Sequence, residues 1–391
     1  ISNQSDIANL YQSIKRIDKG GSIDAAVEKF DPIKRGFLFL AIQEYYRNFE
    51  NFNLFLKRYI SDKTPKNIYI ILKINLVLIF FSKKPQHAIV HDAVEFSKQF
   101  DKSKLINAVL RNILRDQENL TLEKNLPDNF QKVLDKIFSS SKIREYLYQT
   151  FFTKPIDYQI SLNNHKEAIY EKRVLPFKSK LLKNCFVQDI GNYEVIHTTH
   201  QFFQSKKILD VCSAPGGKSI LLHSLGYEVD CIDKSNSQII KFKQNLKRLG
   251  LNIKIQKKDF LKFTKNQNIP SILLDAPCSA LGTFRRNPDV ASKINQSKLK
   301  RNQKIQIQML DKAINILDEN GIIVYIVCSF HPFETINVID KIAQKHKNIS
   351  TLSLDSDKMI KRQNGYFINP LKFKDLGGSD IFFVSVLKKT K

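Results

Sequence analysis

Apolar residues in the first part of the chain recur at the spacing of an amphipathic helix. Isoleucine, leucine and tyrosine keep this spacing over residues 7–14, and alanine and valine keep it over residues 88–94. Positions three and four apart lie on one face of a helix, so each stripe predicts a helix with one buried face. Residues 105–114 repeat the pattern strongly. We therefore predict an all-helical domain over residues 1–116.

The longest apolar run lies inside this helical part. It extends from Ile68 to Phe81 and is interrupted by Lys73 and Asn75. A membrane-spanning helix needs about 20 apolar residues. The run is too short and too polar for that, so it predicts a buried helix and no membrane contact. The start of the chain lacks the pattern of a secretory signal, and we expect a cytoplasmic protein.

The pattern changes further along the chain. Residues 117–200 are less regular and predict a connector of helices and a few strands. Short apolar runs then alternate with amphipathic segments, which predicts strands at 207–211, 228–232, 253–256, 271–274 and 321–327 and helices at 217–225, 237–249 and 296–317. This alternation is typical of a doubly wound, mostly parallel sheet. Residues 366–368 and 381–386 predict an antiparallel edge. The chain is therefore expected to be multidomain, with an α/β domain over residues 201–391.

Charge and cysteine content narrow the choice of partner. The chain has 63 lysines and arginines against 38 acidic residues, a formal net charge of +25. A surplus of this size attracts a polyanion such as nucleic acid, although a general bias toward lysine and asparagine is an alternative explanation. None of the five cysteines forms a C-x-x-C pair. We therefore predict neither a metal site nor a disulfide scaffold.

A glycine turn follows the first predicted strand of the α/β part. Residues 210–218 read Asp-Val-Cys-Ser-Ala-Pro-Gly-Gly-Lys. Glycines let the backbone approach a ligand, and the next helix offers free N–H groups. The turn matches neither the P-loop nor the dinucleotide G-x-G-x-x-G pattern. Asp233 and Asp259 end the next two strands, where carboxylates contact a ribose or an adenine. The alternative is that both cap the helices that follow.

Two further cysteines lie just beyond the ends of predicted strands. Cys278 lies in Asp-Ala-Pro-Cys-Ser over residues 275–279, and Cys328 lies in Val-Cys-Ser over residues 327–329. The carboxyl ends of parallel strands meet at one edge of a sheet, so we expect both thiols to lie near the glycine turn. A thiolate beside a cofactor site indicates nucleophilic catalysis. Taken alone, Cys328 would instead be read as a small core residue, as Cys212 and Cys231 are.

These segments resemble the motifs of the RNA 5-methylcytosine methyltransferases. The resemblance rests on residues 210–218, 275–279, Gly282 with 285–289, and 327–329 followed by Pro332 and Glu334. Residues 85–95 and 104–111 resemble a NusB-type helical domain. The resemblance implies a NusB-like RNA-binding domain at 1–116, a connector or reduced RNA-binding module at 117–200, and a Rossmann-like class I catalytic domain at 201–391. It also implies S-adenosylmethionine as methyl donor and a cytosine of small-subunit ribosomal RNA as target.

The resemblance also implies a role for individual residues. Cys328 would attack the cytosine, Cys278 would assist release of the methylated product, and Asp275 would grip the base. Lys218 would orient the catalytic centre and lower a cysteine pKa. Arg285 and Arg286, just after the cysteine loop, are expected to bind RNA phosphates, unless they are only a solvated pair. The cofactor-binding set comprises Cys212, Ser213, Ala214, Pro215, Gly216, Gly217, Lys218, Asp233, Asp259 and Asp275.

Some positions depart from the family pattern. Gln159, Ser161, the Ile-Gly-Asn run at 190–192 and Thr335 replace residues that are usual there, and the connector is short. These departures concern the placement of RNA more than the chemistry. Two alternatives stay open at this point, the same reaction on transfer RNA and a non-catalytic RNA-binding assembly factor. Because no exposed heptad stripe stands out, we predict a monomer.

Overall fold

The structure is a computed structural model that describes residues 5–153, 155, 157–163, 167–173, 185–264 and 268–390, with only the backbone path for 157–163 and 167–173. It divides into two compact units. Residues 1–131 and 287–293 form the N-terminal unit, and residues 132–286 and 294–391 form the C-terminal unit. The domain boundaries expected at residues 116 and 200 stay predictions. Each unit has its own core and is described by itself.

The N-terminal unit consists of helices packed around α5. Its elements are α1 (Asp6–Asp18), α2 (Ile23–Val27), α3 (Pro32–Arg47), α4 (Phe49–Leu56), α5 (Lys66–Phe81), α6 (Gln86–Ser97), η1 (Lys98–Phe100), α7 (Ser103–Arg115), η2 (Gln117–Asn119) and the short α13 (Asp289–Ser292). Helix α5 contacts α1, α3, α4, α6 and α7. From Ile68 to Ile79 only Tyr69 is not buried. A helix that is apolar all round belongs in a core, so the prediction of a buried helix is confirmed.

Side chains at the start of several helices fix where these helices begin. Ser5, Ser22 and Asp31 each accept a hydrogen bond from a backbone N–H in the first turn of α1, α2 and α3. Such caps satisfy N–H groups that have no partner inside the helix. In the part of the chain that the structure describes, no helix is both long and apolar enough to cross a membrane.

The C-terminal unit begins with two helices and a small sheet. Helix α8 (Asp128–Ile137), which enters this unit at Lys132, and α9 (Ser141–Phe151) precede the strands β1 (Asp157–Asn163), β2 (Glu167–Arg173) and β3 (Cys185–Gln188). The three strands pair antiparallel in the order β2-β1-β3. Helix α10 (Ile190–Thr199) and η3 (His200–Phe202) follow. The Gln159 and Ser161 positions lie on β1, of which the structure describes the backbone alone.

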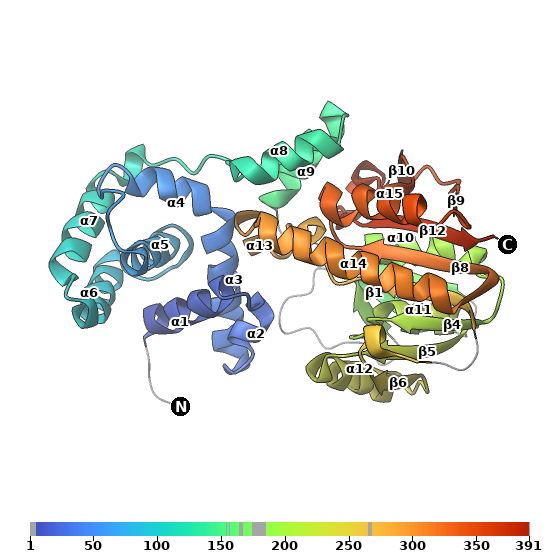
Figure 1. Cartoon of the computed structure of the whole chain (residues 1–391). Coiled ribbons are helices and arrows are strands. Elements are labelled where there is room, and N and C mark those ends of the chain that lie inside the picture. Colours follow the sequence, from blue (N-terminus) through green and yellow to red (C-terminus); the bar gives the residue numbers. More distant parts are fainter. Residues whose placement is uncertain are drawn as a thin grey trace. The chain divides into compact units, whose positions relative to one another are not determined.

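A nine-stranded sheet forms the centre of this unit (Figure 1). Its strands are β4 (Lys207–Val211), β5 (Glu228–Asp233), β6 (Lys254–Lys257), β7 (Ile269–Asp275), β8 (Leu317–Val327), β9 (Ile349–Leu352), β10 (Met359–Arg362), β11 (Gly365–Ile368) and β12 (Phe383–Lys389). The order is β10-β11-β12-β8-β7-β4-β5-β6, and β9 also pairs with β12. The pairs among β4 to β8 are parallel, and β12 runs antiparallel to β8. The predicted mostly parallel sheet and its antiparallel edge are confirmed.

Helices connect the parallel strands. Helix α11 (Gly217–Ser224) lies between β4 and β5 in the chain, α12 (Asn236–Leu249) between β5 and β6, and α14 (Gln296–Ile316) between β7 and β8. Helix α15 (Ile336–Lys345) and the 3-10 turns η4 (Phe260–Lys262), η5 (Leu281–Thr283), η6 (Pro332–Glu334) and η7 (Pro370–Leu376) complete the unit. Strand β4 has β5 on one side and β7 on the other, so the chain order reverses there. Ligands of open α/β sheets bind outside the carboxyl ends of the strands at such a reversal.

The sequence pattern missed β9 and β10. Each has only four residues, and neither is fully buried. Strands this short carry too few positions for an alternating pattern to show. Strand β8 is also longer than predicted, because it already begins at Leu317, before Gly321.

Candidate active site

The carboxyl ends of three neighbouring strands carry the predicted reactive residues. Cys212 directly follows β4, Asp275 ends β7 and Cys328 directly follows β8. In the sheet, Val211 pairs with Leu274 across β4 and β7, and Asp275 pairs with Ile326 across β7 and β8. Because all three strands are parallel, their ends meet at one edge. The structure therefore brings the glycine turn and both cysteine segments together, as the strand pattern predicts.

The glycine turn at the start of α11 depends on Gly216. This residue has φ of 102°, in the left-handed region that favours glycine, and it caps the helix. A Cβ atom added there would lie 2.1 Å from Cδ2 of the Phe242 ring. Only glycine fits both the backbone conformation and the space. The turn thus exposes backbone N–H groups at the first turn of α11, where an anionic or polar ligand is favoured.

Asp233, at the end of β5, holds the glycine turn in place. Its carboxylate accepts hydrogen bonds from the backbone N–H of Ala214 at 3.1 Å and of Ser235 at 2.7 Å. Asp259 accepts one from the N–H of Leu261 at 3.0 Å and begins the short turn η4. For Asp259 the structure thus contains the helix cap that the sequence analysis gave as the alternative to a ligand contact. A carboxylate oxygen has further lone pairs, so the ribose and adenine contacts of Asp233 and Asp259 stay predictions.

Gln188 lies beside the same turn, although the sequence gave it no role. It is 5% exposed, and its Nε2 lies 3.2 Å from the position of a Cβ atom added to Gly217. Neither polar atom of its amide has a hydrogen-bond partner among the residues that the structure describes. A buried amide without partners is unfavourable by about 1–3 kcal/mol. The glycine turn and this amide therefore fit a polar cofactor that passes over the start of α11.

Lys218 and Asp275 form an ion pair at the carboxyl edge of the sheet. The ammonium of Lys218, whose side chain is 9% exposed, donates to Oδ2 of Asp275 at 2.7 Å. Asp275 itself is 30% exposed, so one face of its carboxylate stays accessible. Ser219, the residue after Lys218 in α11, donates to the buried Asp210. Burial is the main cause that raises the pKa of Asp210 to about 7. The accessible Asp275 is thus the carboxylate that a substrate can reach.

The two cysteine side chains touch. Sγ of Cys278 lies 3.4 Å from Sγ of Cys328. The hydrogen bond to Cys328, followed by burial and the neighbouring charges of Cys328 and Glu334, raises the pKa of Cys278 well above its usual value. Lys218 was predicted to lower a cysteine pKa. For Cys278 that prediction is wrong, because the ammonium pairs with Asp275 and the thiol is buried beside a second sulfur.

Gly282 lets the two cysteine segments pack closely. Its N–H donates to the carbonyl oxygen of Cys328 at 3.0 Å, and its own carbonyl oxygen accepts from the N–H of Ile381 at 3.0 Å. A Cβ atom at Gly282 would lie 1.9 Å from the carbonyl oxygen of Ile381. A side chain there would push the segments apart. The close approach explains why this position of the motif is glycine.

A buried carboxylate joins the cysteine segments from the other side. Glu334, which is 0% exposed, accepts hydrogen bonds from the N–H of Ser279 at 2.7 Å and from its hydroxyl. It also accepts from Ser329 Oγ at 2.6 Å and from Asn302 Nδ2 at 2.8 Å. Ser279 and Ser329 directly follow the two cysteines. One side chain therefore fixes the distance between the thiols, a role that the sequence motif alone did not reveal.

Arg285 and Arg286 lie in an ionic cluster. Arg285 Nε lies 3.0 Å from Asp380 Oδ1, and Arg286 contacts Asp380 at 2.9 Å and Asp189 at 2.6 Å. The side chain of Arg285 is 2% exposed and that of Arg286 is 19% exposed. A buried, ion-paired guanidinium cannot reach a phosphate, so the predicted phosphate contact of Arg285 is wrong. For Arg286 the geometry gives that role no support, because both carboxylates already compensate its charge.

The same cluster explains one departure from the family pattern. Gly191 follows Asp189 at the start of α10, and its N–H donates to the Asp189 carboxylate at 2.8 Å. A Cβ atom at Gly191 would lie 2.8 Å from the carbonyl oxygen of Asp380. In this chain a larger residue would not fit there. Thr335, another departure, is buried and donates its hydroxyl to the carbonyl oxygen of His331 at 2.9 Å.

Two family models match the chain. Residues 199–388 match the family described as 16S rRNA methyltransferase RsmB/F, and residues 4–115 match the NusB family. These two matches agree with the resemblance that the sequence motifs indicate, a methyltransferase part that follows a NusB-like helical part. Among the described residues, no group of three or more histidine, cysteine or acidic side chains is placed to hold a metal ion.

Curated relatives carry a more specific name. Ribosomal RNA small subunit methyltransferase B of Photorhabdus laumondii subsp. laumondii is 31% identical over 208 residues, which are 52% of this chain and 46% of that protein. The protein of the same name from Yersinia enterocolitica serotype O:8 is 25% identical over 334 residues, 75% of this chain and 77% of its own. The chain thus spans less than half of the first relative and about three quarters of the second.

Solved structures share the fold. The crystal structure of PH0851 superposes with a TM-score of 0.76 at 16% identity, and the match covers 98% of both chains. A methyltransferase homologue from Pyrococcus horikoshii superposes with a TM-score of 0.50 at 19% identity, over 68% of this chain and all of that one. At these identities the likeness establishes the fold of this chain and nothing finer.

Proposed function

We propose that this protein is an S-adenosylmethionine-dependent methyltransferase that methylates C5 of a cytosine in small-subunit ribosomal RNA through a covalent bond between Cys328 and the base. The observation that carries the proposal is the pair of thiols 3.4 Å apart at the carboxyl edge of the sheet. The Lys218–Asp275 pair lies at the same edge. The formal net charge of +25 favours a polyanionic substrate.

The chemistry of cytosine explains why a thiol is needed. C5 of cytosine is a poor nucleophile, and a thiolate that adds to C6 turns it into a reactive centre. The C5 atom then takes the methyl group, a base removes the C5 proton, and the S–C6 bond breaks to release Cys328. Enzymes that methylate exocyclic amines carry (Asp/Asn)-Pro-Pro-(Tyr/Phe) instead. This chain has Asp-Ala-Pro-Cys over residues 275–278, which favours methylation at carbon.

The two thiols have different roles in this proposal. Because the hydrogen bond to Cys328, burial and the neighbouring charges raise the pKa of Cys278, we assign the proton between the sulfurs to Cys278, which then donates while Cys328 accepts. A hydrogen bond to the charged form of an acid stabilises that form. Cys278 thereby supports the thiolate of Cys328, both before attack and when the S–C6 bond breaks. Asp275, held by Lys218, is placed to accept hydrogen bonds from the edge of the base.

The residues proposed to bind the cofactor lie at the same carboxyl edge of the sheet. S-adenosylmethionine supplies an electrophilic methyl group, and the proposed binding set is Cys212 to Lys218 with Asp233, Asp259 and Asp275. The buried amide of Gln188 is a further candidate because it lies against Gly217 and has no hydrogen-bond partner among the described residues. The turn itself cannot accept a side chain at Gly216. These residues hold the donor beside the thiols, at the reversal of strand order.

The direct test is methyl transfer from labelled S-adenosylmethionine to total RNA from a methylation-deficient strain, with the product mapped by bisulfite sequencing. The expected result is one protected cytosine in small-subunit ribosomal RNA. Label in transfer RNA would keep the mechanism and replace the target. Tight RNA binding without any transfer would contradict the proposal and favour a non-catalytic assembly factor. The predicted monomeric state and the predicted independence of metal are separate expectations.

Glu334 is a positioning residue in this scheme. Glu334→Gln is expected to lower kcat of methyl transfer about 10²-fold, because the amide NH₂ cannot accept from Ser279 or Ser329 and the thiols move apart. The KM for S-adenosylmethionine is expected to stay unchanged, since the glycine turn lies on other segments. The measurement is steady-state methyl transfer with both substrates varied.

The matched control for that variant is Glu319→Gln, which makes the same change at an exposed position of β8. It should leave both constants unchanged. Thermal melting of both variants shows whether the fold is retained. If Glu334→Gln melts normally and turns over at the native rate, the carboxylate does not position the thiols.

A further inference from the structure

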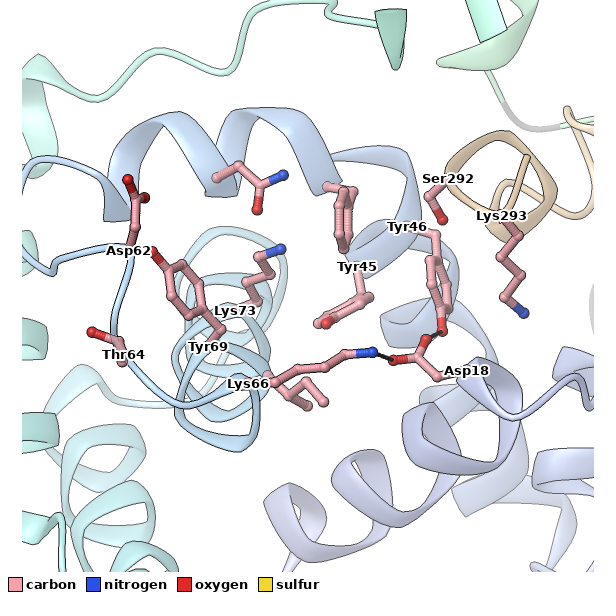
Figure 2. Close-up of a pocket in the computed structure, with 13 residues that line it drawn as sticks. Asp18, Tyr45, Tyr46, Asp62, Thr64, Lys66, Tyr69, Lys73, Ser292 and Lys293 are labelled. Atoms are coloured by element: carbon pink, nitrogen blue, oxygen red, sulfur yellow. Dashed lines mark hydrogen bonds and ion pairs between the residues drawn. The ribbon is translucent and has the colours of Figure 1, made fainter. Parts of the chain in front are cut away.

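The N-terminal unit contains a cavity that the proposed reaction does not use. Its volume is about 460 Å³, within the roughly 300–1,000 Å³ typical of small-ligand pockets. Aromatic and basic side chains from α3, α4 and α5 line it, together with Ser292 and Lys293 from the 287–293 segment of the same unit. Figure 2 shows Lys73 and Tyr69 reaching from α5 into the same space as Tyr45 of α3. The cavity thus combines rings with positive charge.

Lys73 is the unusual member of this lining. It is 4% exposed on the otherwise apolar helix α5. Its ammonium lies 3.5 Å from the centre of the Phe49 ring and 6.0 Å from that of Tyr69. In the part of the chain that the structure describes, it has no hydrogen bond and no ion pair. The ammonium therefore faces the cavity with only aromatic rings as partners.

The other charges at the cavity are already compensated or exposed. Asp18 accepts a hydrogen bond from the Tyr46 hydroxyl at 2.9 Å and pairs with Lys66 at 3.5 Å. Lys293 pairs with Asp289 at 2.9 Å. Asp62 also lines the cavity, but it is exposed to solvent. Lys73 is thus the buried cation of this lining that forms no ion pair among the described residues.

A buried cation without a counter-charge is unfavourable for folding. Burial, which is the largest cause, lowers the pKa of Lys73 to about 7, against the smaller opposing effects of Glu50 and Asp18. Leucine or methionine would fill the same space on α5 without that penalty. An anion in the cavity would compensate the charge and restore an ordinary pKa. The position of Lys73 therefore indicates an anionic ligand.

Tyr69 indicates what else that ligand contains. Its ring is half-buried and lines the same cavity within 6.0 Å of the ammonium. A ligand with an anionic group and a flat ring satisfies both side chains. An acidic peptide would satisfy Lys73 and leave the ring without a partner. Proteins that bind unpaired RNA stack bases on such aromatic rings and place lysines on the phosphates.

We propose that this cavity binds one unpaired nucleotide of the RNA substrate, with a phosphodiester oxygen accepting from Lys73 and the base stacked on Tyr69. The site is distinct from the cysteine edge, since every residue that lines it belongs to the N-terminal unit. The inference rests on the proposed function in one respect, namely that the chain acts on RNA. It names the feature of the RNA that the NusB-like part recognises, an unpaired nucleotide.

The test compares the binding of a short single-stranded oligouridylate to the full chain and to Lys73→Met. Methionine fills similar volume without a charge, so the variant should melt at or above the native temperature. The affinity of Lys73→Met for the oligouridylate is expected to fall about tenfold. The slope of the logarithm of affinity against the logarithm of salt concentration should become shallower by the amount that one phosphate contact contributes. Lys104→Met, an exposed lysine of α7, removes the same net charge and should bind like the native chain.

Two Tyr69 variants separate stacking from other effects. Tyr69→Leu is expected to weaken binding roughly 5- to 100-fold, the range of one base–aromatic stack. Tyr69→Phe keeps the ring and should retain native affinity. A blunt-ended, fully paired RNA duplex should bind equally well to all variants, because it presents no unpaired base. Equal loss for Leu and Phe would exclude stacking and overturn the nucleotide assignment.

The pH dependence of binding distinguishes a lysine that contacts the RNA from a lysine with only a structural role. Below pH 7 Lys73 is protonated before binding. Above pH 7 Lys73 is neutral in the free protein, so binding of the anion requires that it first take up a proton. Affinity for the single strand should therefore decrease between pH 7 and pH 9 in the native chain and not in Lys73→Met. The ionisable groups near the ammonium, Glu50, Asp18, Lys66, Asp62, Lys293, Tyr45 and Tyr69, are common to both proteins.

The outcomes separate this inference from the proposed function. If Lys73→Met binds the single strand as tightly as Lys104→Met does, the inference is overturned even when methyl transfer proceeds. Complete competition by inorganic phosphate would reduce the site to an anion site and also overturn it. Binding that depends on Lys73 and Tyr69 without methyl transfer to any RNA would support the inference and remove the proposed reaction.

Discussion

Cys328→Ala is expected to abolish methyl transfer to RNA, by about 10⁴-fold or more, because the variant has no nucleophile for C6 of the base. Binding of S-adenosylmethionine should be unchanged, since the glycine turn proposed to bind it lies between β4 and α11. The measurement combines labelled methyl transfer with calorimetric titration of the cofactor.

A second cysteine provides the control for that result. Cys231 is 1% exposed in β5, and burial, the largest cause, raises the pKa of its thiol above the usual range. Cys231→Ala removes a thiol of the same unit but leaves both sulfurs of the active edge in place. It should cost some stability and retain turnover. Native turnover in Cys328→Ala would remove the covalent mechanism.

Cys278→Ala is expected to accumulate a covalent complex between the protein and RNA. Attack by Cys328 does not require Cys278, but breakdown of the S–C6 bond loses the contact with the Cys278 thiol, whose sulfur lies 3.4 Å from that of Cys328. The adduct should appear as a slowly migrating band in a denaturing gel after incubation with RNA and S-adenosylmethionine. Product release should slow while the first turnover stays measurable.

The double variant identifies the bond in that complex. Cys278→Ala combined with Cys328→Ala should give no adduct, because the attacking sulfur is missing. A band that persists in the double variant would place the bond on another residue. A Cys278→Ala protein that turns over normally and shows no band would contradict the assistance that the contact between the two sulfurs indicates.

The local pattern of the chain was sufficient for the fold class and for the place of the reactive residues. Alternating short apolar runs and amphipathic helices predict a parallel sheet because strand and helix have different side-chain periods. Parallel strands expose their carboxyl ends at one edge. Cys278 and Cys328, which follow two such strands, therefore had to lie near the turn at Gly216. The structure places their sulfur atoms in contact.

Tertiary contacts decided what the local pattern could not. Glu334 lies between two serines that are far apart in sequence, and Arg285 lies against Asp380 rather than on the surface. Neither contact has a periodic signal, because the partners come from separate elements that meet only after folding. An arginine just after the cysteine loop therefore looked like a phosphate ligand until its counter-charges were visible.

Lys73 shows the same division most clearly. In the sequence it is a polar interruption of an apolar run, enough to predict a buried helix rather than a membrane span. Only the packing of α5 against α3 and α4 decides which side of that helix is filled by side chains and which side borders a cavity. The sequence determined that a lysine is buried, and the tertiary structure determined that it forms no ion pair among the described residues. That follows because helical periodicity records burial, whereas the pairing of charges depends on distances between different helices.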